Sequence, residues 1–164
     1  MTKIIDKERF YYNPEFLGSS SGRSVRILSE YYGPFQRMQR NRISDTIVFF
    51  GSARILAREV AQDALDNASK DRDKQSLKRL KMDLKMSRYY EDARTLAGKF
   101  TKWSKGLKGT KHRYIICSGG GPGIMEASNR GASEAGGVNV GLTISLPNES
   151  SANKWISDDL DMKF

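Results

Sequence analysis

A glycine-rich stretch at residues 118–126 carries the residue types in this sequence that are best suited to chemistry. It lies between a short apolar run, 114–117, and an alanine-rich run that ends at Gly136-Gly137. This order predicts a strand, a glycine turn and a helix. Glycines let a phosphate approach the backbone, and the N–H groups at a helix start favour an anion. The stretch therefore indicates a phosphate site, and a tight turn without a ligand is the alternative.

The spacing of the glycines excludes two common phosphate motifs. The stretch lacks the Lys and Ser/Thr of a P-loop, and it is not a G-x-G-x-x-G motif with an acidic residue at the ribose distance. A second turn of small residues, Gly51-Ser52, follows the apolar run 46–50. Because parallel strands end at one edge of a sheet, where such sheets bind ligands, the two turns are expected together. Ser52 would donate to an anion there or cap a following helix.

The remaining elements follow from hydrophobic spacing. A helix is expected over 23–43, broken or kinked by Gly33-Pro34. Strands are expected over 46–50, buried on both faces, and over 138–147. A helix begins near Arg54, and a long amphipathic helix covers 80–103. The order β–α–α–β–α–β predicts an α/β fold, a Rossmann-like parallel sheet with helices on both faces.

Length and composition set broad bounds. The 164 residues predict one main domain, 43–164, preceded by a helical N-terminal extension, 1–42. The single cysteine, Cys117, excludes an internal disulfide and is expected to be a small core thiol. No apolar run has transmembrane length and no signal peptide is evident, so a soluble cytoplasmic protein without a membrane partner is expected.

The net charge of +9 is unevenly distributed. Residues 70–113 carry a net charge of +10, whereas 114–164 carry −3, so the basic segment and the glycine stretch are separate features. The basic residues are the solvent face of the long helix or a surface for an acidic partner. Nucleic-acid binding through this segment ranks last among the functions considered, because no recognised nucleic-acid motif accompanies it.

Three blocks of the sequence resemble the LOG family. They are Phe49-Phe50-Gly51-Ser52-Ala53-Arg54; Ser118-Gly119-Gly120-Gly121-Pro122-Gly123-Ile124-Met125-Glu126-Ala127 with Asn129-Arg130-Gly131-Ala132; and Gly141-Leu142-Thr143-Ile144-Ser145-Leu146-Pro147. Members of this family are cytokinin riboside 5′-monophosphate phosphoribohydrolases, formerly labelled lysine decarboxylases. The resemblance runs from about residue 20 to the last residue, and the order and spacing are similar to those of the larger bacterial members.

The resemblance implies hydrolysis of the N-glycosidic bond of a purine nucleoside 5′-monophosphate, such as AMP, to the free base and ribose 5-phosphate. It implies a homodimer and no metal or redox cofactor. The matching positions imply a nucleotide site made of Gly51, Ser52, Gly119, Gly120, Gly121, Pro122, Gly123, Met125 and Glu126. Glu126 would contact the ribose hydroxyls, or it is simply an acid favoured at a helix N-terminus.

The sequence departs from the family at one important point. The P-G-G-x-G-T-x-x-E motif and the preceding Arg-Lys pair, which carry the family's catalytic residues, do not occur, so no catalytic residue is assigned. The chain thus resembles an N-terminal portion of a LOG domain, and an incomplete sheet is expected to require a homodimer or completion by another chain. A nucleotide-binding module without catalysis is the alternative function. Lysine decarboxylation is disfavoured because neither turn contains a lysine.

Overall fold

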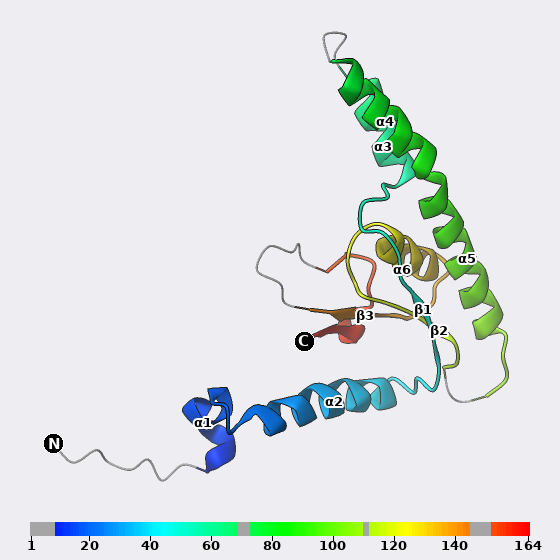
Figure 1. Ribbon diagram of the computed structural model, residues 1–164. Coiled ribbons are helices and arrows are strands. Elements are labelled where there is room, and N and C mark those ends of the chain that lie inside the picture. The colour runs from blue at the N-terminus through cyan, green and yellow to red at the C-terminus, as the bar shows by residue number, and fades with distance from the viewer. Residues whose placement is uncertain (1–8, 69–72, 110–111, 145–151) are drawn as a thin grey trace. The chain divides into compact units, whose positions relative to one another are not determined.

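The computed structural model describes residues 9–68, 73–109, 112–144 and 152–164 (Figure 1). The chain divides into two compact units, Met1–Arg37 and Met38–Phe164. The predicted assignment of 1–42 as an extension stays a prediction. None of the helices in the described ranges is both long and apolar enough to cross a membrane.

The first unit contains a 3-10 turn, η1 (Phe10–Tyr12), the short helix α1 (Pro14–Gly18) and most of α2 (Arg23–Arg40). Asn13 caps α1, because its side chain accepts a hydrogen bond of 2.9 Å from the Phe16 N–H. Helix α2 runs through Gly33-Pro34, so a break at this point is wrong, whereas the alternative, a kink, stays a prediction. Proline mainly disfavours a helical residue before it through a clash with that residue's Cβ, and Gly33 has no Cβ.

The second unit is built on a four-stranded parallel sheet with the order β1-β2-β3-β4. The strands are β1 (Thr46–Phe49), β2 (Ile115–Ser118), β3 (Asn139–Thr143) and β4 (Asp161–Lys163). The predicted α/β class and Rossmann-like parallel sheet are confirmed. The sequence analysis missed β4, because a three-residue strand with Met162 as its one apolar residue is too short to show a period.

Helices α3 (Arg58–Asp66), α4 (Lys74–Met86) and α5 (Arg88–Lys105) connect β1 to β2, and α6 (Ile124–Glu134) connects β2 to β3. The 3-10 turn η2 (Asp158–Leu160) precedes β4. Right-handed crossovers along a sequential strand order place their helices on one face of the sheet. Accordingly, α5 and α6 pack against one another and both contact β2 (Figure 1).

The predicted long helix, 80–103, is divided at Ser87. The backbone of Ser87 is still right-handed helical, and its carbonyl accepts a hydrogen bond of 3.2 Å from the Glu91 N–H. The Ser87 hydroxyl donates to the Leu84 carbonyl at 2.7 Å. Helices α4 and α5 therefore continue one another with only a local irregularity (Figure 1).

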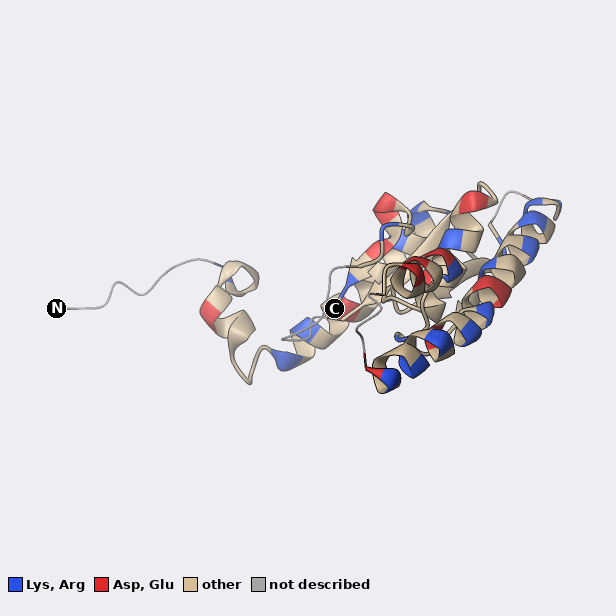
Figure 2. Ribbon diagram, turned by 90° about the horizontal axis from the view of Figure 1, so that it is seen from above, with Lys and Arg blue, Asp and Glu red and all other residues tan. Residues whose placement is uncertain are grey.

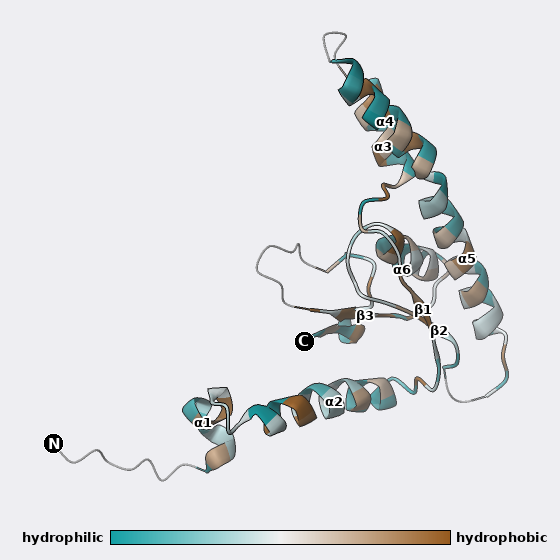
Figure 3. Cartoon of the chain, viewed as in Figure 1, coloured by the Kyte–Doolittle hydropathy of each residue, from teal (hydrophilic) through white to brown (hydrophobic). Residues whose placement is uncertain are grey.

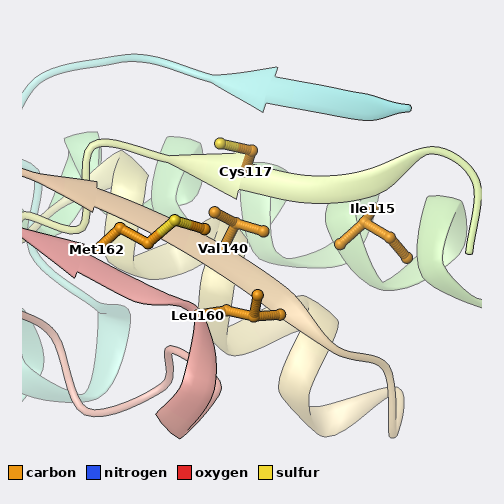
Figure 4. Packing of buried hydrophobic residues seen from close by; sticks show 5 residues of the cluster. All are labelled: Ile115, Cys117, Val140, Leu160 and Met162. Atoms are coloured by element: carbon orange, nitrogen blue, oxygen red, sulfur yellow. The ribbon is translucent and has the colours of Figure 1, made fainter. Parts of the chain in front are cut away.

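The core lies on both faces of the sheet. Ile116 packs with Ala97 and Ala132 from the helices on one face. The opposite face carries a cluster of five buried side chains, with Met38 from the last turn of α2 and Ile43 packed against it (Figure 4). The cluster consists of Ile115, Cys117, Val140, Leu160 and Met162. Apolar residues concentrate in the strands, whereas α4 is mainly hydrophilic (Figure 3).

Strand β1 differs from its prediction in burial. It was expected to be buried on both faces, but Val48 is 52% exposed and Phe50, just beyond the strand, is 77% exposed. Ile47 and Phe49 pack against the helix face of the sheet, whereas the alternate residue Val48 projects to the opposite face and lines a pocket there. Strand β1 is also an edge strand, paired only with β2 in the described sheet. The predicted third strand, 138–147, is β3, and its residues 145–147 lie outside the described ranges.

Candidate functional site

The glycine turn joins the carboxyl end of β2 to the first residue of α6, as the sequence predicts. Gly120 and Gly123 both have φ of +72°, a conformation that favours glycine. A Cβ at Gly120 would lie 2.3 Å from Thr143 Cγ2, and one at Gly123 would lie 2.2 Å from the Ser52 carbonyl oxygen. Both glycines are therefore required by the conformation of the turn itself.

The structure brings the two predicted turns into contact. The Ser52 carbonyl accepts a hydrogen bond of 3.2 Å from the Ile124 N–H at the start of α6. A Cβ at Gly51 would lie 2.7 Å from the Ile124 Cβ, so glycine is needed for this approach. The Ser52 hydroxyl accepts from the Arg54 N–H at 3.2 Å. Ser52 does not cap the following helix, because α3 begins only at Arg58.

A network of buried polar side chains fixes the glycine turn. The Ser118 hydroxyl donates to the Asn129 amide oxygen at 2.6 Å and accepts from the Gly120 N–H at 3.0 Å. The Asn129 amide nitrogen donates to the Asn139 side chain at 2.8 Å. The Asn153 amide nitrogen donates to the carbonyls of Gly120 and Gly121 and to Asn129. Hydrogen bonds from within the protein therefore fix the conformation of the turn without a ligand.

An apolar pocket of about 630 Å³ lies beside this turn, at the carboxyl ends of the strands. It is lined by Val48, Phe50, Gly51, Ala53, Cys117, Ser118, Gly119, Gly121, Pro122, Met125, Leu142 and Ile144. Five of the predicted site residues thus line the pocket, namely Gly51, Gly119, Gly121, Pro122 and Met125. The other four do not line it, namely Ser52, Gly120, Gly123 and Glu126.

Glu126 faces α5 instead. Its Oε1 accepts a hydrogen bond of 2.9 Å from the hydroxyl of Tyr90, a buried residue of α5. Burial, together with the neighbouring Glu126 carboxylate, raises the pKa of Tyr90 to about 12, so the phenol keeps its proton and donates at neutral pH. No described residue that lines the pocket carries a carboxylate.

A set of ion pairs braces α6 against its neighbours. Arg130 pairs with Glu59 of α3 and, at 3.0 Å, with Glu134 of its own helix. Arg94 of α5 binds both oxygens of Glu134, at 2.6 and 2.7 Å. Partial burial opposes the charge of Arg130, but its hydrogen bonds to Glu59, Tyr90 and Glu134 raise the pKa of the guanidinium above its ordinary value. These contacts hold the C-terminal half of α6 against α3 and α5.

Cys117 is among the lining residues of the pocket and belongs to the buried cluster shown in Figure 4. It is buried, as the sequence analysis expected, and burial raises the pKa of its thiol to about 11. The side chain is therefore a neutral thiol at physiological pH and a poor nucleophile. In the described ranges no group of three or more His, Cys, Asp or Glu side chains is arranged to hold a metal ion.

The supporting residues Tyr90, Asn139 and Asn153 were not singled out from the sequence. One signal for Asn139 was available, since an amide in an apolar strand must find a buried hydrogen-bond partner. Tyr90 and Asn153 lie 36 and 33 residues from the residues they bind, Glu126 and Gly120, so local spacing could not connect them.

Comparison with known families adds one finding. Residues 106–163, which include β2, the glycine turn, α6, β3 and β4, match the SLOG cluster4 family, LDcluster4. The SLOG superfamily is related to LOG-like, Rossmann-like proteins that handle nucleotides, so the match supports a nucleotide-related function at a coarse level. It does not extend to the LOG family itself. No curated protein matches the sequence.

Proposed function

We propose that the glycine turn and the adjoining pocket bind a purine nucleoside 5′-monophosphate. The observation that carries this proposal is the position of a rigidly held glycine turn, at the start of an 11-residue helix, beside a pocket of about 630 Å³. Nucleotide sites of α/β proteins combine these parts at the carboxyl ends of their strands. The volume is also within the range of about 300 to 1,000 Å³ typical of small-molecule sites.

The phosphate is assigned to the turn. Gly119 and Gly121 line the pocket and have no side chain to block the backbone, and the flexible Met125 side chain is the nearest group to a Cβ built at either position. The positive end of the α6 dipole points the same way. This geometry supports binding of an anion by backbone groups rather than by a lysine or arginine side chain.

The base is assigned to the apolar part of the pocket. Val48, Phe50, Leu142 and Ile144 line it, and Phe50 is largely exposed. An aromatic ring that is free on one face can stack on a purine, and the surrounding aliphatic side chains exclude water from the base. An apolar wall next to a phosphate-binding turn therefore favours a nucleotide over inorganic phosphate.

Hydrolysis of the N-glycosidic bond is the finer candidate, and the resemblance to the LOG family favours it. Water would add its hydroxyl group to the ribose C1′ while its proton goes to the departing base, leaving ribose 5-phosphate. The positive charge that develops on the ribose requires a carboxylate nearby. Glu126 is turned toward Tyr90 and does not line the pocket, so binding is the part that the described residues support best.

Calorimetric titration of the chain with AMP, adenine and ribose 5-phosphate tests the proposal. We expect Phe50→Ala to weaken AMP binding about tenfold and to leave ribose 5-phosphate binding unchanged, because only the base loses a contact. Gly121→Ala should weaken both ligands. Val60→Ala, which alters an exposed aliphatic side chain on α3, is the control. Absence of AMP binding would refute the proposal, and chromatographic detection of released adenine would establish hydrolysis.

A further inference from the structure

Four large apolar side chains are exposed along one line of the α4–α5 helix pair. Met82, Tyr89, Leu96 and Trp103 are each between 42% and 50% exposed. They are spaced by seven residues, which is close to two helical turns, so they share one side of the helix with a drift of only about 20° per step. We refer to these four residues as the heptad stripe.

The helical backbone supports the stripe as a continuous feature. Ser87, between Met82 and Tyr89, keeps a helical conformation, so the register is carried from α4 into α5. With a rise of about 1.5 Å per residue, the stripe extends for about 32 Å. At the C-terminal end of the stripe, the centroids of the Trp103 and Tyr114 rings are 5.0 Å apart, so Tyr114 packs against Trp103. This length suits contact with another helix rather than with a small molecule.

The two flanks of the stripe differ. Of the residues one position after the stripe, Tyr90, Ala97 and Ser104 are buried in the body of the domain. The fourth, Asp83, is partly buried. The residues of the other flank are exposed and almost entirely basic. Figure 2 shows that Lys and Arg outnumber Asp and Glu along this helix pair. The basic flank consists of Lys78, Lys85 and Lys99, four residues before a stripe member, and Lys81, Arg88 and Lys102, one residue before. Asp92 is the one acidic residue at these positions.

We propose that the heptad stripe is a docking surface for an amphipathic helix of a partner protein that carries acidic residues along the edge of its apolar seam. Seven-residue spacing of Met, Leu and aromatic side chains is the pattern by which helices pack together. Because the flank is basic, it favours a partner helix with acidic residues at the facing positions. A second copy of the same helix would place lysines against lysines, and a nucleic acid would gain little from Met82 and Leu96.

A designed peptide provides the probe. It has about four heptads, with Leu at the seam positions and Glu at the flanking positions, so that it does not associate with itself. The matched peptide has Lys at the same flanking positions. Fluorescence anisotropy with the full chain should show at least about tenfold tighter binding of the acidic peptide than of the basic one.

Variants at exposed positions test the surface without disturbing the core. Leu96→Gln keeps a good helix former and should weaken binding of the acidic peptide about tenfold. Val60→Gln, at an exposed aliphatic residue of α3, should leave binding unchanged. The double variant Lys85→Glu with Lys99→Glu should reverse the preference toward the basic peptide. Circular dichroism and thermal unfolding confirm that each variant is folded.

Four results would overturn the proposal. One is the absence of binding by the acidic peptide, and another is equal affinity for the two peptides. A third is a single-stranded oligonucleotide that displaces the peptide and whose own affinity is insensitive to Leu96→Gln, which would assign the surface to nucleic acid. The fourth is a sedimenting dimer of the chain that Leu96→Gln dissociates, which would assign the surface to a second copy.

Discussion

The glycine turn and the α4–α5 helix pair distribute polar and apolar side chains in opposite ways. Around the turn, Ser118, Asn129 and Asn139 are at most 1% exposed, and each has hydrogen-bond partners. Along α4–α5, large apolar residues such as Leu96 are about half exposed between lysines. Proteins usually bury apolar groups and expose polar ones, so both regions depart from the rule.

The difference corresponds to two kinds of binding site, one that is preorganised and one that a partner covers. Burying a polar network costs desolvation free energy. Hydrogen bonds within the network offset this cost only when every polar group has a partner, so such a network favours a single conformation. An exposed apolar stripe leaves favourable burial unused until a partner covers it. The turn is therefore a site prepared in advance, whereas α4–α5 is a surface completed by contact.

The largest expected effect comes from breaking the buried network with Asn129→Ala. This change removes the partner of Ser118, Asn139 and Asn153 together. Leaving several buried polar groups unpaired should lower the free energy of unfolding by roughly 3 to 4 kcal/mol, as measured by urea denaturation. Asn67→Ala, at an exposed helix end, makes the matched control and should cost under about 1 kcal/mol. Equal losses at the two positions would mean that the network contributes nothing special.

The same substitution at two leucines compares the regions directly. Leu160 is 1% exposed in the sheet cluster, whereas Leu96 is 46% exposed in the heptad stripe. Leu160→Ala should lower the free energy of unfolding by about 3 kcal/mol, because it leaves a cavity. Leu96→Ala should lower it by less than about 1 kcal/mol. A large loss at Leu96, read from the midpoint of urea denaturation, would contradict the view that this stripe is uncovered.

A third change tests how closely α5 and α6 approach. A Cβ at Gly131 would lie 2.0 Å from the Arg94 carbonyl oxygen, which cannot move without shifting α5. Gly131→Ala should therefore lower the free energy of unfolding by about 2 kcal/mol in thermal or urea denaturation. Gly18→Ala, at the last residue of α1, brings the added Cβ within 4 Å of no atom beyond its chain neighbours and should be neutral or slightly stabilising. If both variants were neutral, the contact between α5 and α6 would be looser than described.

The smallest expected effect is a change in how the free energy of unfolding depends on pH. Hydrogen bonds from Arg94 lower the pKa of Glu134 below its ordinary value of 4.5, so the folded state binds this proton less readily than the unfolded state. The ion pair therefore contributes stability above pH 4.5 that is lost as the pH falls through the lowered pKa. Because Glu134 is about one-third exposed, solvent screening limits the contribution to under about 1 kcal/mol.

Unfolding measured between neutral pH and pH 3 tests this effect. Glu134→Gln should flatten the acid side of the stability profile, whereas Glu30→Gln, at an exposed position of α2, should leave its slope unchanged. An identical slope in the wild type and in Glu134→Gln would show that this ion pair does not contribute. The wild type and the two variants should have similar circular dichroism at neutral pH.

Much of the fold was accessible from the sequence because it depends on local patterns. The apolar runs that became β1, β2 and β3, the turn at Gly119–Gly123 and the helix that follows it are each encoded within a few residues. The seven-residue spacing of Met82, Tyr89, Leu96 and Trp103 is also present in the sequence, where it favours a stripe of core residues, but the structure leaves these four side chains about half exposed.

Only the tertiary structure decided which of these residues are covered. The strand order leaves β1 at an edge, and Val48 projects into a pocket and stays half exposed. The packing of α5 against α6 buries Tyr90 while leaving Leu96 outside. It also turned Glu126 toward Tyr90 and brought Asn153 to the glycine turn, across 36 and 33 residues of sequence. Hydrophobic periodicity and turn-forming residues depend on positions a few residues apart, so the sequence alone predicts the elements that they form. Burial and long-range hydrogen bonds depend on which segments meet, and that is fixed only when the sheet and its helices assemble.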